Sequence, residues 1–243
     1  LTLNTIYSMK RNILLNPGPA TTTDSVKEAL MVPDICPREQ EFGELTQAVL
    51  KKIVQVVNGV PSHAAIIFTG SGTAGVEAAL SSVVPQDGKI LILDNGAYGK
   101  RAETIVQAYG IQCRTHRMVW GDYPDVDDVE AIFKEDRELT HFVFVHHETT
   151  TGMLNPLREL LQLCQKYEVD SIVDAMSSYA GLPIDMSELP IDYLISSSNK
   201  CIQGMAGTSF VIANKEKLIK TAGITPRNLY LNLWGNHSYI EKT

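Results

Sequence analysis

Cysteine, clustered basic residues and long apolar runs are all scarce in this 243-residue sequence, and each scarcity excludes a class of protein. The four cysteines are widely spaced and form no CxxC pair, so we expect free thiols in a reducing compartment rather than a disulfide framework. No run approaches the roughly 18 apolar residues that span a bilayer. The net charge is −7 and the Lys and Arg residues are scattered, which argues against nucleic acid or an anionic membrane as a partner.

The first residues are expected to be an N-terminal extension. Leu1–Lys10 lacks the basic and then apolar pattern of a secretory signal, so the predicted location is cytoplasmic. Met9 is a candidate natural start, which would leave Leu1–Ser8 as an upstream remnant. We therefore expect residues 1–11 to lie ahead of the folded part.

Residues 12–62 are expected to form an arm and one long helix. The stretch Asn16–Ala20 reads Asn-Pro-Gly-Pro-Ala, which is rich in turn residues and cannot be helical. Further on, apolar residues recur at spacings of three and four and predict a single apolar helix face, formed by Phe42, Leu45, Val49, Ile53 and Val56. Asn58 and Gly59 predict the end of that helix.

Residues 63–222 carry the pattern of one α/β domain. Short apolar runs suit strands covered on both faces: Ala64–Thr69, Ile90–Asp94, His141–His146, Ser171–Asp174, Tyr193–Ser197 and Ser209–Ala213. Amphipathic segments suit helices: Ala74–Val84, Arg101–Tyr109, Asp127–Lys134, Leu157–Tyr167 and Lys215–Thr221. This alternation predicts a mostly parallel central sheet with helices on both faces.

The last residues, 223–243, are expected to begin a linker. Leu229–Trp234 is apolar, and the sequence stops at Thr243 without a closing element. Because large exposed apolar stretches generally mark an interface, these residues need a partner surface. We expect a C-terminal small domain that is missing from this chain.

A Gly/Ser-rich turn, Thr69–Gly75, joins the first predicted strand to the next helix. Its amides would lie at a helix N-terminus, where phosphate binds, and the hydroxyls of Ser71 and Thr73 would help. The turn is neither a Walker loop nor a dinucleotide-binding fingerprint. Taken alone, an ordinary strand–helix turn explains it equally well.

Two charged residues follow later strands at the edge where α/β sheets bind ligands. Asp174 ends a buried strand, where a carboxylate is costly without a cationic partner such as a pyridinium nitrogen. Capping of the next turn is the alternative reading for Asp174. Lys200 follows the strand Tyr193–Ser197 in a loop of small polar residues, and a lysine there is either solvated or available to form a Schiff base.

A His-His-Glu cluster, His146 to Glu148, suggests a metal site at first sight. Adjacent histidines at a strand end point to opposite faces, so they cannot readily bind one ion, and no metal is predicted. The hydroxyls of Thr149–Thr151 are better placed to hydrogen-bond a ring substituent or a substrate. A phosphate loop, a strand-end Asp and a strand-end Lys in this order meet the needs of pyridoxal 5′-phosphate (PLP).

Longer strings carry a family resemblance over nearly the whole chain, from about Asn12 onward. They are Asn16-Pro-Gly-Pro-Ala-Thr-Thr, Gly70-Ser-Gly-Thr, Asn95-Gly-Ala-Tyr-Gly-Lys-Arg, His147-Glu-Thr-Thr-Thr-Gly, Val173-Asp-Ala-Met-Ser-Ser and Ser198-Asn-Lys-Cys-Ile-Gln-Gly. The sequence resembles the class V, fold-type I PLP-dependent aminotransferases, and within that class the 2-aminoethylphosphonate–pyruvate transaminases. The resemblance implies that the chain is the PLP-binding large domain of such an enzyme.

The resemblance also implies a role for each candidate site residue. Lys200 matches the Schiff-base lysine, and Asp174 matches the aspartate at the pyridine nitrogen. The cofactor-binding positions are Ser71, Gly72 and Thr73 at the phosphate, Tyr98 stacked on the ring, Thr149 near the ring O3′, and Asn199 as a further phosphate contact.

The implied reaction transfers the amino group of 2-aminoethylphosphonate to pyruvate and yields phosphonoacetaldehyde and L-alanine. The partners are then a small-molecule amino donor, a 2-oxo acid and a second copy of the protein, since a homodimer completes each phosphate site in the family. The family's substrate-binding arginine belongs to the missing domain. Arg38 and Arg227 are auxiliary anion candidates, and solvated arginines are the alternative.

Other functions share the same core. An alanine–glyoxylate or serine–pyruvate aminotransferase is the second enzyme hypothesis. A cysteine desulfurase is disfavoured, because Cys201 lies too close to Lys200 to carry a persulfide. A non-catalytic binding domain that has kept the fold is the alternative from another class.

Overall fold

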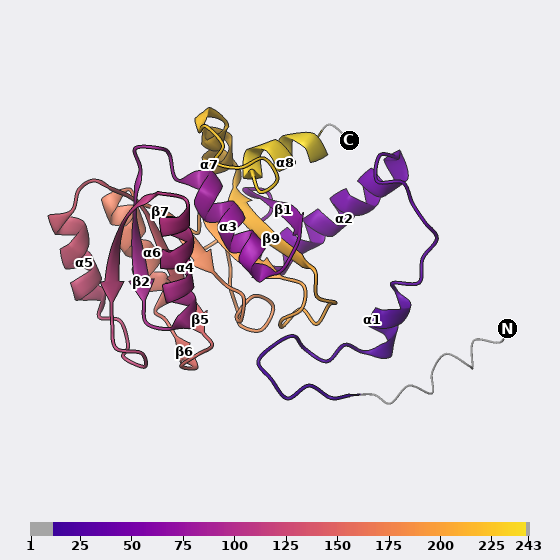
Figure 1. Ribbon diagram of the computed structural model, residues 1–243, viewed down its shortest axis with the longest axis horizontal. Helices are drawn as coiled ribbons and strands as arrows, with labels where there is room; N and C mark the ends of the chain where they lie inside the picture. Colours follow the sequence, from indigo (N-terminus) through magenta and orange to yellow (C-terminus); the bar gives the residue numbers. More distant parts are fainter. Residues whose placement is uncertain (1–11, 242–243) are drawn as a thin grey trace.

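A seven-stranded sheet forms the centre of the computed structural model, which describes residues 12–241 (Figure 1). The strand order is β1-β9-β8-β7-β4-β2-β3. The strands are β1 His63–Thr69, β2 Lys89–Asp94, β3 Gln112–Arg117, β4 Leu139–Val145, β7 Asp170–Asp174, β8 Tyr193–Ser197 and β9 Thr208–Asn214. Within this sheet β9 runs in the direction opposite to all the other strands, so the prediction of a mostly parallel sheet is confirmed. The expected extension, residues 1–11, lies outside the described part.

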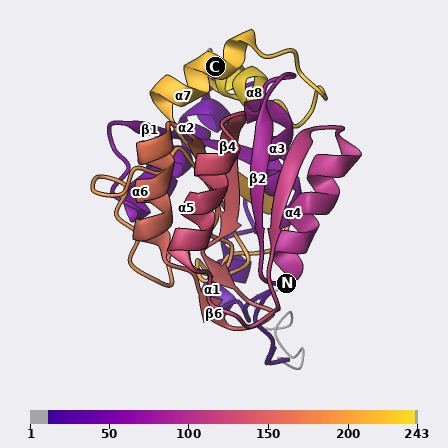
Figure 2. The ribbon, with the colours of Figure 1, turned by 90° about the vertical axis from the view of Figure 1, so that its left-hand side faces the viewer.

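Two apolar layers cover the sheet because successive strand residues point to opposite faces. In β2, Leu91 and Leu93 join one core cluster, and Ile90 and Ile92 join the other. The helices are α2 Gln40–Val56, α3 Gly72–Val83, α4 Ala97–Ala108, α5 Val126–Glu135, α6 Leu157–Tyr167, α7 Lys215–Lys220 and α8 Leu233–Ile240. Figure 2 shows α5 and α6 on one side of the sheet and α3 and α4 on the other. This is the predicted arrangement of helices on both faces.

Strand β3 was not predicted from the sequence. It lies at the sheet edge, pairs only with β2, and is polar and half-exposed along its length. An edge strand of this kind lacks the apolar run by which the buried strands were recognised. A second small element, the hairpin of β5 His147–Glu148 with β6 Met153–Leu154, was also missed.

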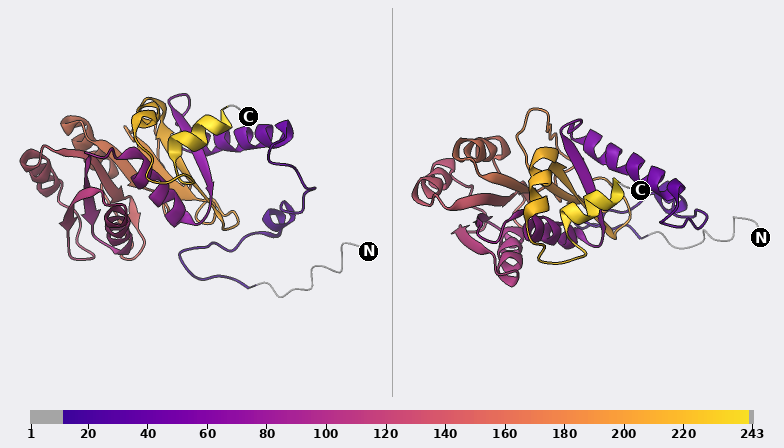
Figure 3. Two further views of the ribbon diagram at one scale, coloured as in Figure 1. Left: turned by 45° about the horizontal axis from the view of Figure 1, so that its top comes forward. Right: turned by 90° about the horizontal axis from the view of Figure 1, so that it is seen from above.

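The long helix α2 ends before Asn58 and Gly59 as predicted, but most of its predicted apolar face is exposed. Leu50, Ile53 and Val54 are the buried residues. The other members of the predicted face are substantially exposed: Phe42 38%, Leu45 53%, Val49 38% and Val56 49%. For Phe42, Leu45 and Val49 the physical reason is that the first half of α2 projects past edge strand β1, while only its last turns lie on the sheet (Figures 1 and 3).

The two ends of the described chain differ in how they pack. Toward the N-terminus, the short helix α1 Asp24–Glu28 buries no side chain, and the arm around it extends from the body (Figure 3). At the other end, Leu233 is fully buried, and Ser82 Oγ accepts a hydrogen bond from its backbone N–H. The expectation that this apolar segment lacks a partner surface within the chain was therefore wrong for Leu233, although Leu229 and Tyr230 are exposed. Within residues 12–241, every helix is too short or too polar to cross a bilayer.

Candidate active site

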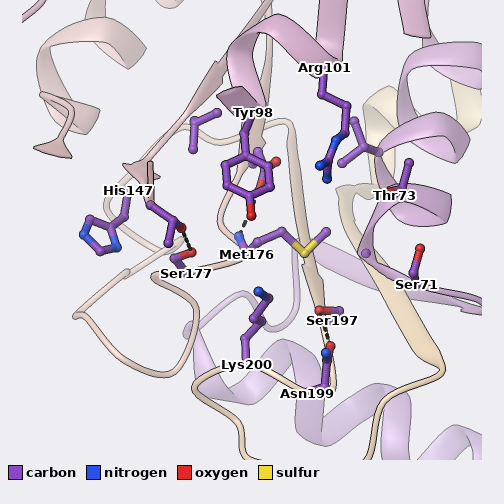
Figure 4. A pocket seen from close by; sticks show the side chains of 15 residues that line it. Ser71, Thr73, Tyr98, Arg101, His147, Met176, Ser177, Ser197, Asn199 and Lys200 are labelled. Atoms are coloured by element: carbon purple, nitrogen blue, oxygen red, sulfur yellow. Dashed lines mark hydrogen bonds between the residues drawn. The ribbon is translucent and has the colours of Figure 1, made fainter. Parts of the chain in front are cut away.

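A cavity of about 180 Å³ lies at the carboxyl edge of the parallel strands. It is bordered by the start of α3, the start of α4, the ends of β4, β7 and β8, and the loop after β8 (Figure 4). All of the sequence-predicted site residues line it: Ser71, Gly72, Thr73, Tyr98, Thr149, Asp174, Asn199 and Lys200. The structure thus brings together residues that are far apart in the sequence.

Asp174 ends β7 at the floor of this cavity and is 6% exposed. Burial raises the pKa of its carboxyl from 3.8 to about 6. The N–H of Met176 opposes that rise by donating a 2.9 Å hydrogen bond to Oδ1, and the positive charges of Arg101 and Lys200 oppose it weakly. A cation in the cavity would stabilise the ionised form of this buried carboxyl, and a protonated ring nitrogen is such a cation.

Lys200 lies in the turn after β8, where the N–H of Gln203 donates to its carbonyl at 2.9 Å. The arm crosses over this turn, and the N–H of Ala20 donates to the carbonyl of Asn199 at 2.9 Å. Gly18, with φ +155°, passes so close that a Cβ there would lie 2.6 Å from Lys200 Cδ and 2.7 Å from Nζ. The Asn16-Pro-Gly-Pro string therefore contacts Lys200, a position that was not predicted from the sequence.

The start of α3 has the features of an anion site. Ser71 is its N-cap, and the Ser71 side chain makes no capping hydrogen bond, so the hydroxyl can turn to a ligand. The first N–H groups of a helix have no intrahelical acceptor. A Cβ at Gly72 would lie 2.7 Å from Met176 Sδ, so the Met176 side chain would have to shift. Nearby, Ser197 Oγ donates to Asn199 Oδ1 at 2.9 Å, which leaves the Asn199 amide N–H groups for a ligand.

Tyr98 stands in the first turn of α4, and its ring lies in the middle of the cavity (Figure 4). Its backbone N–H donates to the buried carboxylate of Glu148 at 3.2 Å. Thr149 lies at the cavity wall, where its hydroxyl shares a short hydrogen bond with the hydroxyl of Ser177. The aromatic ring therefore comes from helix α4, and the two hydroxyls come from the turns that follow β5 and β7.

The two adjacent histidines occupy different environments. His146 is buried and hydrogen-bonds Ser178 Oγ through Nδ1 at 2.9 Å, and burial lowers its pKa to about 4. His147 lines the cavity instead. Among residues 12–241, no group of three His, Cys, Asp or Glu side chains is arranged to hold a metal ion.

Sequence reasoning missed Arg101 and Met176, which also line the cavity. The guanidinium of Arg101 lies 4.8 Å from the centre of the Tyr98 ring. The three-residue spacing from Tyr98 on a helix was the signal that could have found it, because such pairs share a face. The arginines that were considered have other positions: Arg227 donates to the carbonyls of Ser81, Val84 and Pro85, and Arg38 is exposed and outside the cavity lining.

Comparison with known proteins gives the family. The aminotransferase class-V family matches residues 32–228. The chain belongs to this family. Curated relatives include the 2-aminoethylphosphonate–pyruvate transaminases of Klebsiella pneumoniae, 42% identical over 94% of the chain and 62% of the relative, and of Pseudomonas fluorescens, 40% identical over 95% and 62%.

Solved structures agree on the fold. An alanine–glyoxylate aminotransferase from Nostoc sp. has a TM-score of 0.88 at 26% identity, covering 96% of this chain and 62% of that one. An aspartate aminotransferase from Thermus thermophilus has a TM-score of 0.85 at 23% identity, covering 95% and 64%. The chain thus has the large-domain fold of fold-type I aminotransferases and spans about three fifths of the length of these relatives. The remainder of the relatives has no counterpart here, as the expected missing domain requires.

PLP is the cofactor that this family assignment supports, and the residues present fit it. The helix N-terminus at Ser71 suits the phosphate, and the buried Asp174 carboxylate suits the ring nitrogen. Lys200 presents an amine, and Tyr98 presents an aromatic face, in the same cavity. A ligand with a phosphate, a cationic ring and an aldehyde meets each of these groups.

Proposed function

We propose that the protein containing this chain transfers the amino group of 2-aminoethylphosphonate to pyruvate and yields phosphonoacetaldehyde and L-alanine. The observation that carries the proposal is the identity of 40–42% to curated transaminases of this name over 94–95% of the chain. The cavity supports it, since it gathers an amine, a buried carboxylate and a helix N-terminus.

Lys200 has the central role in this proposal. When bound, PLP supplies an aldehyde that takes up the amino group and a ring that accepts an electron pair. Lys200 Nζ would hold the cofactor covalently between turnovers. Once released by the substrate, the same nitrogen would serve as the base that takes the proton from the carbon that carries the amino group.

The other lining residues hold and tune the cofactor in the proposal. Asp174 keeps the ring nitrogen protonated, and Tyr98 covers one face of the ring. Thr149 donates a hydrogen bond to the ring O3′. The phosphate is bound by Ser71, Gly72 and Thr73 at the start of α3, with Asn199 as a further contact. In domain terms, residues 12–62 are the arm and first helix, 63–222 the cofactor-binding domain and 223–243 the start of a linker.

An alanine–glyoxylate or serine–pyruvate aminotransferase is the second candidate. The similarity to the Nostoc sp. enzyme, with a TM-score of 0.88, favours it. Both activities need the same cavity, so the identity of the amino donor distinguishes them. A non-catalytic domain is the third candidate, and it is distinguished by failure to bind PLP.

A donor screen tests the proposal. The purified protein is saturated with PLP and given 2-aminoethylphosphonate, alanine or serine, each with pyruvate or glyoxylate. We expect the fastest formation of L-alanine from 2-aminoethylphosphonate and pyruvate, and none from the Lys200→Ala variant. Faster reaction of alanine with glyoxylate would assign the second candidate, and a protein that remains colourless with PLP would assign the third.

We propose further that the protein is a homodimer and works in the cytoplasm. The exposed apolar half of α2 (Phe42, Leu45 and Val49) and the extended arm support an interface with a second copy. The four cysteines are free, which suits a reducing compartment. Sedimentation of the protein tests the dimer.

A further inference from the structure

Arg101 is a cation in the cavity to which no role has been given. Its side chain extends from α4 into the cavity between Tyr98 and Thr73 (Figure 4). Arg101 is exposed, and within residues 12–241 no carboxylate lies at ion-pair distance from its guanidinium. An arginine that faces a cavity without an anionic partner is arranged to receive one from a ligand.

The charges of the cavity lining point to a phosphate. Among the described lining residues, the basic side chains are those of Lys200, Arg101 and His147. Asp174 is the one carboxylate among them. Once Lys200 is bonded to the cofactor and Asp174 faces the ring nitrogen, Arg101 is the cation left to balance a phosphate dianion. The proposal therefore rests on the proposed cofactor.

The position of Arg101 decides which part of the ligand it meets. It lies beside Thr73, at the α3 end of the cavity, while Lys200 and Ser177 lie toward the opposite side (Figure 4). The free start of α3 is at the same end. We infer that Arg101 binds the phosphate of the cofactor together with the N-terminus of α3.

The packing of Arg101 suits this role. Its guanidinium lies 4.8 Å from the centre of the Tyr98 ring, a contact that restricts the side chain before a ligand arrives. A guanidinium can stack on a ring and still present two N–H groups to a phosphate in its own plane, which an ammonium cannot do. Arginine at position 101 thus links the residue that covers the ring to the residues that hold the phosphate.

The test compares two ligands that differ only in the phosphate. Affinities for PLP and for pyridoxal are measured by absorption titration of the purified protein and of the Arg101→Gln and Arg101→Lys variants. Loss of a charged hydrogen bond predicts that Arg101→Gln weakens PLP binding by about 10- to 100-fold and leaves pyridoxal binding within about twofold. For Arg101→Lys we expect a PLP affinity between those of the unsubstituted protein and Arg101→Gln. Arg158→Gln is the matched control, because Arg158 pairs with Glu188 on the surface.

Each other outcome overturns the inference in a recognisable way. An equal loss of PLP and pyridoxal affinity means that Arg101 only supports the Tyr98 ring. Unchanged PLP affinity with a raised KM for 2-aminoethylphosphonate assigns Arg101 to the phosphonate of the donor instead. Failure of the unsubstituted protein to bind PLP contradicts the proposed function itself and removes the inference with it.

Discussion

The carboxylate of Glu148 accepts a 3.2 Å hydrogen bond from the backbone N–H of Tyr98, and Glu148 is 0% exposed. Its other oxygen accepts from the N–H and hydroxyl of Thr150 at 3.2 and 2.8 Å. The N-cap of α4 is Gly96, which has no side chain, so Glu148 caps this helix from strand β5. Among the described residues no Lys or Arg forms an ion pair with Glu148, and the backbone N–H groups of Tyr98 and Thr150 donate hydrogen bonds to its carboxylate instead.

Glu148→Gln tests this link between the helix cap and Tyr98, which we propose covers the cofactor ring. A glutamine amide has a single acceptor oxygen, so it can accept from the N–H of Tyr98 or from the N–H of Thr150 but not from both. Its own NH₂ group would then face the other backbone N–H. We expect kcat to fall by about tenfold and the absorption band of the bound cofactor to shift. Glu159→Gln, on the exposed face of α6, is the matched control. An unchanged band with unchanged kcat would show that Tyr98 does not depend on this carboxylate.

Gly18→Ala tests the contact between the arm and Lys200. Its φ of +155° is unfavourable for alanine, and the added methyl would lie 2.6 Å from Lys200 Cδ. The arm or the lysine must shift, so we expect slower capture of PLP and a lower kcat. Gly121→Ala is a suitable control, since it also has a positive φ but no atom within 4 Å of the added methyl. Similar kinetics in the two variants would mean that the arm does not position Lys200.

Asp174→Asn is expected to keep the cofactor but to transaminate about 10³-fold more slowly, because an amide cannot hold the ring proton. Steady-state kinetics with PLP in excess measures the loss. A variant within a few-fold of the unsubstituted protein would show that another group charges the ring.

The same substitution changes how the stability of the cofactor-free protein depends on pH. Because the folded-state pKa of Asp174 is raised from 3.8 to about 6, the folded protein keeps a proton that the unfolded chain releases between these values. The carboxyl of Asp174 therefore makes its full contribution to the free energy of unfolding below about pH 4. That contribution falls by about 3 kcal/mol as the pH rises through 6. We expect Asp174→Asn to be the more stable protein at pH 7 and to lose that advantage at pH 4. Urea unfolding at both pH values checks this, and a difference independent of pH would contradict it.

The apolar half of α2 gives a test of the proposed homodimer. Leu45 is 53% exposed, so Leu45→Gln removes little from the folded monomer. We expect the variant to dissociate at higher concentrations than the unsubstituted protein and to lose activity earlier in a dilution series. Light scattering follows the mass in parallel. A fully active monomer would contradict the proposal.

The buried part of the fold could be predicted because its sequence signal is local. Tyr193–Ser197 and Leu157–Tyr167 were predicted with the bounds that the structure gives, since each has a clear apolar period. Edge strand β3 could not be found this way because its residues are polar. The apolar period of α2 was real, but the sequence does not reveal that the first half of the helix projects beyond the sheet.

The residues of the candidate site could likewise be predicted only where their signal is local in the sequence. Asp174 and Lys200 were found because they follow recognisable strands. Glu148 and Gly18 were not, because their importance comes from contacts with residues far away in the sequence, Tyr98 and Lys200. Arg101 was overlooked because a helical arginine is ordinarily solvated, and its three-residue spacing from Tyr98 was not used.

The central claim is that Lys200 is the residue that binds the cofactor covalently. Borohydride reduction of the PLP-loaded protein fixes the cofactor to its lysine, and peptide mapping then locates the pyridoxyl group. We expect the label on Lys200, and none on the folded Lys200→Ala variant. A label on Lys100 or any other lysine, with Lys200 unmodified, would contradict the account.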